Sequence, residues 1–253
     1  MIDTHCHLTD PRLASQLPAV LGRAHTAGVT RIVTIGTDLE DDRQCVKLCQ
    51  SLPILRCVVG VHPNYVNETD ESHLPQLREI QSDPSVVALG EMGLDYHYGS
   101  ESKDRQKRFF EYQLQLATEV NKPIVIHCRE AVPDCLAILA NFPQLKFLFH
   151  CFTGTPAEAK QILDRGYLLG FTGVITFKNS QPLRDVIAFT PWDRLLVETD
   201  APYLSPEPFR KQKVNEPALV VHTAAEVARI KNVSIEKVDE ETTRNAFSFY
   251  GEW

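Results

Sequence analysis

Histidine and carboxylate side chains recur at the ends of short apolar runs in this chain. The seven residues of this kind are His5, His7, His62, Glu91, His127, His150 and Asp200. One histidine at the end of a strand is more often a packed core residue or a helix cap than a metal ligand. Burying several histidines and carboxylates together, however, costs free energy unless a cation pairs with them. Their number therefore predicts a divalent-metal site.

All of these residues except His62 are predicted metal ligands. Six ligands exceed the three or four that one catalytic zinc takes, which indicates two metals ~3.5 to 4 Å apart that share a bridging carboxylate. Glu91 lies between the two groups of histidines along the chain and is the natural bridge. The cofactors predicted are two divalent metal ions, and the donor atoms suit zinc, manganese or magnesium.

The elements that must position these residues follow from the apolar pattern. Eight short, β-branched runs alternate with segments of helical period, and the runs are IDTHCHL, RIVTIG, CVVGV, VVALGE, PIVIH, FLFH, YLLGFTG and LLVETD. Apolar strands covered by helices indicate a parallel sheet. Eight such units in 253 residues favour one α/β domain, residues 1–253, with a (β/α)8 TIM-type barrel fold. No glycine-rich nucleotide-binding motif follows any run, which argues against a nucleotide-binding protein.

In such a barrel the carboxyl ends of the strands form one rim, where the seven residues would meet. The period of two in a β-strand places His5 and His7 on one face and Cys6 on the other. The same alternation turns the cysteines after the two later histidines away from the metal, so we expect packing rather than ligation from them. The helical tail from about Pro217 to Tyr250 is expected to cover the outside of the barrel.

The composition is that of an ordinary soluble globular protein, with 43% apolar and 23% charged residues. A net charge of −7 argues against a broad nucleic-acid-binding face, but not against a narrow active-site groove in which metal ions supply positive charge. Seven cysteines inside strand-like and helix-like segments are typical of reduced thiols. No apolar run approaches the ~20 residues of a membrane helix. We therefore expect a cytoplasmic protein with no membrane contact and no obligate protein partner.

The chain resembles the TatD family of metal-dependent deoxyribonucleases, within the wider amidohydrolase-like barrel superfamily. The matching segments are DTHCHL, GVHP, GEMGLDY, IHCRE, HCFTG, ETDAPYL and NEP, spread from residue 3 to residue 217. The HxH pattern is shared by many amidohydrolases, whereas GEMGLDY, HCFTG and ETDAP together are specific. The resemblance implies a barrel fold and hydrolysis of DNA phosphodiesters, commonly from a 3′ end.

The resemblance also implies how the ligands divide. One metal would be held by His5, His7, Glu91 and Asp200, and the second by Glu91, His127 and His150. One departure concerns the basic loop before NEP, where family members tend to have an Arg-Gly-Lys-Arg-like stretch. Here the loop reads RKQKV over residues 210–214, with no glycine and one residue more, so strand contacts by this loop do not carry over directly.

A two-metal hydrolysis assigns roles to the two carboxylate ligands. Asp200, a ligand near the nucleophile, is the expected general base, and Glu91 is the bridging catalytic carboxylate. Arg129 should share a face with His127 and could neutralise a phosphate, while His62 could donate a hydrogen bond to it. The alternatives are an ion pair at the barrel rim for Arg129 and a helix cap for His62.

Two further residues are candidate contacts to the end of a single DNA strand. Asp95 and Tyr203 are expected in rim loops, where Tyr203 could stack on a base. Either residue could instead only order its loop. Asp3 and Glu198 are expected one step deeper than the ligands, where they would orient them or form an interior ion pair.

Three other functions fit parts of the pattern. A small-molecule amidohydrolase or esterase could use the same metal site, although many such barrels bridge their metals with a modified lysine where this chain has Glu91. An aminoacyl-RNA hydrolase would need similar phosphate contacts. A scaffold with a structural metal fits least, because structural sites are usually closed and rich in cysteine.

Overall fold

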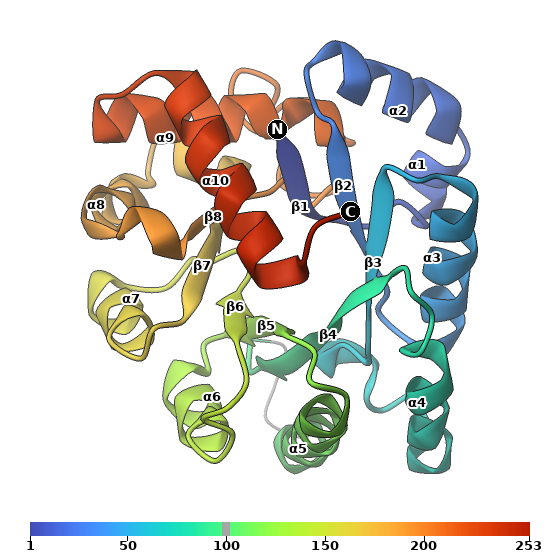
Figure 1. Cartoon of the computed structure of the whole chain (residues 1–253). Coiled ribbons are helices and arrows are strands. Elements are labelled where there is room, and N and C mark those ends of the chain that lie inside the picture. The colour runs from blue at the N-terminus through green and yellow to red at the C-terminus, as the bar shows by residue number, and fades with distance from the viewer. Residues whose placement is uncertain (98–101) are drawn as a thin grey trace. The chain divides into compact units, whose positions relative to one another are not determined.

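The computed structural model describes residues 1–97 and 102–253, in which eight strands alternate with helices (Figure 1). The strands are β1 (Ile2–Cys6), β2 (Arg31–Ile35), β3 (Leu55–Val59), β4 (Val86–Asp95), β5 (Ile124–Arg129), β6 (Phe147–Phe149), β7 (Leu168–Phe171) and β8 (Leu195–Val197). They form one sheet whose order follows the sequence from β1 to β8. The predicted (β/α)8 TIM-type barrel fold is therefore confirmed.

Helices follow the strands as the periodicity predicts. The α-helices are α1 (Pro11–Ala14), α2 (Leu17–Thr26), α3 (Leu39–Ser51), α4 (Leu77–Ile80), α5 (Lys103–Val120), α6 (Val132–Leu139), α7 (Pro156–Leu163), α8 (Gln181–Phe189), α9 (Val220–Lys231) and α10 (Ile235–Tyr250). Short 3-10 helices are η1 (Pro63–Tyr65), η2 (Glu71–Gln76), η3 (Gly173–Thr176), η4 (Trp192–Arg194) and η5 (Pro217–Leu219). The expected helical tail corresponds to η5, α9 and α10.

The chain packs as two compact units. Unit 1 comprises Met1–Thr34 and Cys151–Trp253, and unit 2 comprises Ile35–His150. That residues 1–253 form one domain stays a prediction. In unit 1, β1 pairs with β2 and β7 with β8, both in parallel. Helix α10 packs against β1 and β8 (Figure 1), so the tail covers these strands as expected.

In unit 2, the strands β3 to β6 pair in parallel, and the register of β4 against β5 shifts between Leu89 and Met92. Gly90 lies in this shift with a φ of 136°, and a Cβ atom there would collide with the carbonyl oxygen of Val125. Only glycine tolerates that backbone and that approach. Because β4 continues past the irregularity to Asp95, it is longer than the predicted run, which ends at Glu91.

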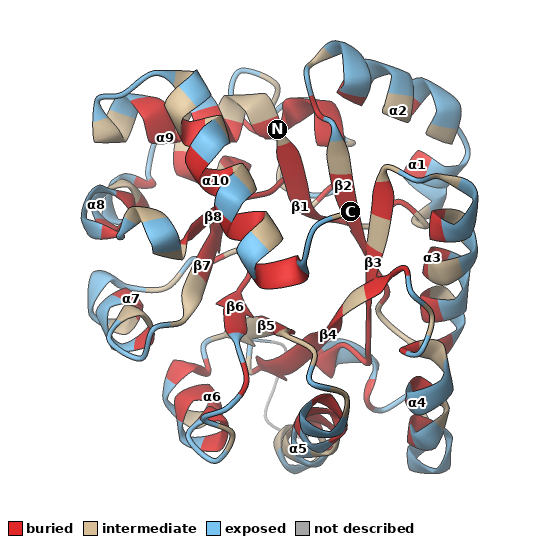
Figure 2. Ribbon diagram, viewed as in Figure 1, coloured by how far each residue is buried: buried red, intermediate tan, exposed pale blue. Residues whose placement is uncertain are grey.

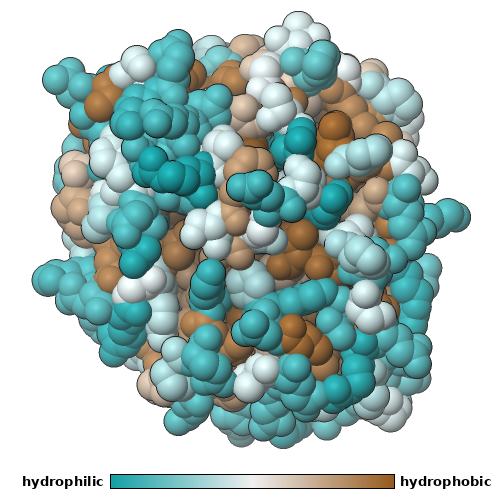
Figure 3. Space-filling view, in the orientation of Figure 1, coloured by the Kyte–Doolittle hydropathy of each residue, from teal (hydrophilic) through white to brown (hydrophobic). Residues whose placement is uncertain are grey.

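The core lies on the strands and on the strand-facing sides of the helices, as the buried residues in Figure 2 show. The face in Figure 3 is mostly hydrophilic, with apolar side chains scattered among charged ones. All seven cysteines lie in the described residues and are free thiols, and five of them are buried. No helix within residues 1–97 and 102–253 is long and apolar enough to cross a membrane.

Unit 2 contains a buried carboxyl group, that of Asp42, for which the sequence does not indicate a partner. Asp42 on α3 is fully buried, and its Oδ1 accepts a hydrogen bond from the backbone N of Gly60 at 3.0 Å. Its Oδ2 has no hydrogen-bond partner within the described part of the chain. Burial raises the pKa of Asp42 well above its usual range, and the bond from Gly60 only partly counters this.

Replacing Asp42 by asparagine is expected to stabilise the folded protein relative to wild type, and to do so more strongly as the pH rises. Folded wild type retains the Asp42 proton at pH values where the unfolded chain has lost it, so raising the pH removes stability between the unfolded and the folded pKa. Asparagine cannot ionise. The free energy of unfolding of Asp42→Asn minus that of wild type should therefore increase by about 1.4 kcal/mol per pH unit in this window. Urea unfolding at a series of pH values that rises from the unfolded pKa of about 4 measures this difference. A difference that does not change with pH would contradict the prediction.

Candidate metal site

Two histidines and one aspartate of unit 1 approach one another at the carboxyl ends of β1 and β8: His5 lies within β1, and His7 and Asp200 follow β1 and β8. Oδ1 of Asp200 lies 3.4 Å from Nε2 of His7 and 3.7 Å from Nε2 of His5. One ligand atom of each residue lies within 4.8 Å of the others. His5 is buried, whereas His7 and Asp200 are half-buried. Two imidazoles and a carboxylate that converge in this way match the donor atoms of a divalent metal site.

Backbone hydrogen bonds hold this arrangement. The N–H of Asp200 donates to the carbonyl oxygen of His5 at 2.9 Å, and the N–H of His7 donates to that of Ala201 at 2.7 Å. A β-bridge between Cys6 and Ala201 extends the pairing of β1 beyond β8. His5 and His7 therefore share one face, as the strand period predicts, while Cys6 is fully buried between them in the chain.

Two fully buried carboxyl groups support the same segments from below. Asp3 accepts hydrogen bonds from Thr199, at Oδ1 from the backbone N at 2.9 Å and at Oδ2 from Oγ1 at 2.6 Å. Oε1 of Glu198 accepts one from the backbone N of Cys151 at 2.6 Å. Burial raises the pKa of Asp3 to about 8, although the bonds from Thr199 lower it. Because Asp3 holds the residue before Asp200, its contacts support the orienting interpretation.

In unit 2, three imidazoles surround one carboxylate oxygen. Oε1 of Glu91 lies 2.6 Å from Nε2 of His150, 2.7 Å from Nδ1 of His127 and 3.4 Å from Nε2 of His62. Glu91 is only 2% exposed. The four residues of this group come from β4, from β5 and from the segments after β3 and β6. The strand ends of unit 2 thus bring together the residues that the sequence predicts to meet there.

The electrostatics of this group favour a cation. Burial would raise the pKa of Glu91, but the charges of His150 and His62 hold it well below its usual range. Burial and the neighbouring His127 lower the pKa of His62 to about 4. Burial also acts to lower the pKa of His127, but hydrogen bonds with Asp95 and Glu91 raise it to about 9. A buried carboxylate surrounded by imidazoles is a donor set that a divalent metal stabilises.

His62 belongs to this group more closely than the sequence indicates. Its Nδ1 accepts a hydrogen bond from the backbone N of Asn64 at 3.0 Å and so caps η1, which is the alternative considered above. Its Nε2 also lies 3.1 Å from Nδ1 of His127. His62, Glu91 and His127 form a possible metal-binding triple. The signal in the sequence was a histidine directly after a strand, which we interpreted as a phosphate contact or a helix cap and not as a neighbour of Glu91.

Asp95 lies within β4 and not in a rim loop, so its predicted position is wrong. The strand continues beyond its register shift and carries Asp95 into the interior, where it is 2% exposed. Its Oδ2 lies 3.0 Å from Nε2 of His127, and its N–H donates to Oε1 of Gln106 at 2.9 Å. These contacts place Asp95 behind His127.

Arg129 ends β5 and pairs in register with Asp95. It is half-buried, on the same strand as His127 and two residues further on. Burial would raise the pKa of Asp95, but His127 and, more weakly, Arg129 hold it below its usual range. Arg129 therefore lies within electrostatic reach of the carboxylate that contacts His127.

Tyr203 lies in unit 1 with 48% of its surface exposed. Its ring centroid is 6.1 Å from that of His7, and Nδ2 of Asn215 donates to its carbonyl oxygen at 2.6 Å. In the basic loop ahead of Asn215, the guanidinium of Arg210 stands 3.8 Å from the ring centroid of Phe177. The structure thus places Tyr203 beside a predicted ligand, as an exposed rim residue.

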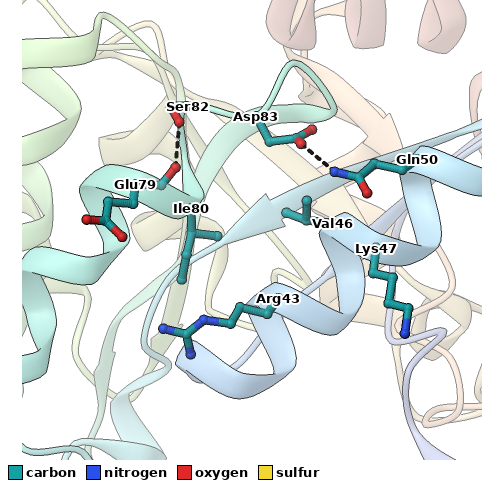
Figure 4. A pocket seen from close by; sticks show the side chains of 8 residues that line it. All are labelled: Arg43, Val46, Lys47, Gln50, Glu79, Ile80, Ser82 and Asp83. Atoms are coloured by element: carbon teal, nitrogen blue, oxygen red, sulfur yellow. Dashed lines mark hydrogen bonds between the residues drawn. The ribbon is translucent and has the colours of Figure 1, made fainter.

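Unit 2 also has a surface pocket of about 320 Å³, which is not lined by any of these histidines (Figure 4). Side chains of α3, of α4 and of the segment after α4 line it: Arg43, Val46, Lys47, Gln50, Glu79, Ile80, Ser82 and Asp83. Gln50 donates to Oδ2 of Asp83 across it at 2.7 Å. Its lining contains no histidine and no group of possible metal ligands.

The six predicted ligands thus form two groups, His5, His7 and Asp200 in unit 1 and Glu91, His127 and His150 in unit 2. His5, His7 and Asp200 are a possible metal-binding triple, and in unit 2 Oε1 of Glu91 lies 2.7 Å from His127 and 2.6 Å from His150. Imidazole nitrogens and carboxylate oxygens of this kind suit a divalent metal. That Glu91 is shared between two metals stays a prediction.

Comparison with known proteins identifies the family of this chain. The family model described as TatD related DNase matches residues 2–251. The chain is 37% identical to an uncharacterized metal-dependent hydrolase, YabD of Bacillus subtilis, over 97% of both chains. It is 35% identical to the 3′-5′ ssDNA/RNA exonuclease TatD of Edwardsiella piscicida, again over 97% of both. The crystal structure of YjjV, a TatD homolog from Escherichia coli K12, superposes with a TM-score of 0.93 and 27% identity, covering 100% of this chain and 98% of that one. The chain therefore belongs to the TatD family of metal-dependent hydrolases.

Proposed function

We propose that this hydrolase cleaves DNA phosphodiester bonds with two divalent metal ions, removing nucleotides from the 3′ end of a single strand in a narrow groove. The observation that carries the proposal is the set of imidazoles around Oε1 of Glu91, together with the His5, His7 and Asp200 group. The relative named as a 3′-5′ ssDNA/RNA exonuclease supports the choice of substrate.

The ligands divide as the family resemblance implies. His5, His7, Glu91 and Asp200 would hold one ion, and Glu91, His127 and His150 the other. Bound divalent ions, whether zinc, manganese or magnesium, supply positive charge that acidifies water and offsets the charge of a phosphodiester. Asp200 accepts the proton of the attacking water as general base. His62 and Arg129 hold the phosphate, and Tyr203 contacts a base.

We assign Asp95 an orienting role in place of the substrate contact expected from the sequence. Its Oδ2 engages Nε2 of His127 at 3.0 Å, which leaves Nδ1 directed toward Glu91 at 2.7 Å. A carboxylate behind a metal-binding histidine fixes the tautomer and the orientation of the ring. Burial of Asp95 fits this role, because a contact to a strand in solution would need an accessible side chain.

We also propose that the protein acts in the cytoplasm. Seven free cysteines support this location, because an oxidising compartment favours disulfides.

Removing the metal is expected to abolish hydrolysis of DNA, and replacing it to restore hydrolysis. The protein is chelated, reloaded separately with magnesium, manganese or zinc, and given single-stranded and double-stranded DNA labelled at either end. Release of mononucleotides from the 3′ end of the single strand, in a metal-dependent manner, supports the proposal. Glu91→Ala, treated identically, is the control for contaminating nucleases.

If the metal-loaded protein does not hydrolyse DNA, the proposed nuclease function is contradicted. Parallel assays with small carboxylic esters and amides, and with aminoacyl-RNA, would then test whether the same site acts on C–O or C–N bonds.

A further inference from the structure

Arg12 on α1 stands over the ring of Tyr203, with Cζ 4.6 Å from the ring centroid. The Tyr203 ring in turn meets the ring of His7, with the two planes at 74°. Guanidinium, phenol ring and imidazole thus form one continuous contact within unit 1. It leads from exposed side chains to the His5, His7 and Asp200 group.

Asp10 fixes the plane of this guanidinium. Nε of Arg12 donates to Oδ1 of Asp10 at 2.9 Å, and Nη2 donates to Oδ2 at 2.7 Å. Two parallel hydrogen bonds of this kind restrict the rotation of an arginine head group. Oδ1 also accepts from the backbone N of Arg12 at 2.9 Å, which caps α1. The flat group is therefore held in place before any ligand arrives.

Backbone bonds tie both halves of the stack to the predicted ligands. The N–H of Tyr203 donates to the carbonyl oxygen of Asp200 at 2.9 Å, and the N–H of Asp10 donates to that of His7 at 3.2 Å. The stack is thus positioned by the same two segments that position His7 and Asp200. A group bound on it would lie beside His7 and Asp200.

The chemistry of the stack favours a planar ligand over a phosphate. Asp10 balances the charge of Arg12, so the pair attracts an anion less than a single arginine would. The Arg12 and Tyr203 side chains nevertheless remain 40% and 48% exposed, and both are flat. Unstacked bases of single strands pack on aromatic rings and on guanidinium planes.

We propose that Asp10, Arg12 and Tyr203 form a stacking site for an unpaired nucleobase next to the bond that is cleaved. The proposal rests on the proposed nuclease function and narrows its substrate to unpaired strand ends. A paired base within a duplex already has both faces covered by its neighbours, so it cannot enter the stack.

The test measures binding of a fluorescent oligothymidylate to the metal-loaded protein by anisotropy. The last two linkages are phosphorothioates, which slow hydrolysis, and matched strands carry an abasic residue at the last or the penultimate position. Arg12→Ala should weaken binding of the intact strand about tenfold. One abasic strand should bind equally weakly to wild type, and Arg12→Ala should weaken that strand no further, because both changes remove the same contact.

Two further variants separate stacking from charge and from folding. Arg12→Lys keeps the charge but has no planar group, and it should lose as much affinity as Arg12→Ala. Arg229→Ala is the matched control: Arg229 also forms a bidentate pair with a carboxylate, at 2.8 and 2.7 Å from Glu226 on α9. Its removal should leave binding unchanged.

The salt dependence distinguishes the stack from a phosphate contact. Stacking predicts the same slope of log Kd against log salt for wild type and Arg12→Ala, whereas loss of a phosphate contact lowers that slope by about 0.7. A reduced slope, an unchanged Kd, or losses that add with the abasic strand would overturn the stacking site. So would wild-type protein that binds no oligothymidylate.

Failure of the nuclease itself is recognised separately. Wild type is assayed on thymidine 5′-(4-nitrophenyl phosphate) and on methyl 4-nitrophenyl phosphate, which share a leaving group and differ in the nucleoside. One outcome is that wild type hydrolyses neither compound, while Arg12→Ala weakens binding of the intact oligothymidylate but not of the abasic strand. That outcome would support the stacking site and contradict the nuclease function. Hydrolysis of both at rates that Arg12→Ala lowers equally would reject the stacking site alone.

Discussion

Replacing Glu91 with alanine is expected to lower turnover of DNA by more than about a hundredfold and to release bound metal. Removing a residue that only supports a metal ligand costs about ten- to a hundredfold, so the loss of the central carboxylate should cost more. Oε1 of Glu91 is within 2.7 Å of nitrogen atoms of both His127 and His150, and no other carboxylate oxygen in the described part of unit 2 has that position. Without it, three imidazoles face a cavity with no negative charge at its centre.

Metal content by mass spectrometry and steady-state kinetics on single-stranded DNA measure the two effects together. Glu91→Gln keeps the size of the side chain and one oxygen, so it separates lost charge from lost packing. Glu119→Ala is the matched control, because Glu119 is an exposed glutamate of unit 2 whose ion pair with Arg78 lies on the surface. Unchanged metal content and turnover in Glu91→Ala would refute the assigned metal site.

The second large effect concerns Asp200. Asp200→Asn is expected to lower kcat by about 10² to 10⁴ while metal remains bound, because asparagine keeps an oxygen near His5 and His7 but cannot accept the proton of the attacking water. In wild type, the rate should rise with pH as the general base loses its proton, and this acidic limb of the pH–rate profile should be absent in Asp200→Asn. Stopped assays across pH on the metal-loaded variant measure both.

Metal content decides between the two roles of Asp200. Full metal occupancy with wild-type kcat would exclude Asp200 as the general base. Loss of metal with loss of activity would leave only its role as a ligand. Asp193→Asn is the matched control, since Asp193 precedes the same strand, is 64% exposed and pairs with Arg194 at the surface.

Local features of the chain were sufficient to predict the architecture. The alternation of β-branched runs with amphipathic segments, repeated eight times, specifies parallel strands covered by helices, and that pattern is independent of any particular contact. The strand period was also sufficient to place His5 and His7 on one face, because backbone geometry alone determines it. Both predictions concern properties that neighbouring residues determine.

The positions of Asp95 and His62 show where sequence reasoning ended. Asp95 was expected in a loop, but β4 continues past the register shift between Leu89 and Met92, and Asp95 at its end contacts His127. His62 was predicted as a phosphate contact or a helix cap; it caps η1, and its Nε2 also lies 3.4 Å from Oε1 of Glu91. Both contacts join residues more than 25 positions apart, and they depend on how adjacent strands align, which no local pattern specifies.

The sequence by itself was sufficient for the class of fold, for the family and for candidate metal ligands, because these depend on residue type, order and periodicity. Only the tertiary structure decided that Asp95 supports His127 and that Asp10 fixes Arg12 over Tyr203. The physical reason is that a side chain's role depends on the few ångströms around its end. Those neighbours come from distant segments, whose approach is set by packing of the whole unit.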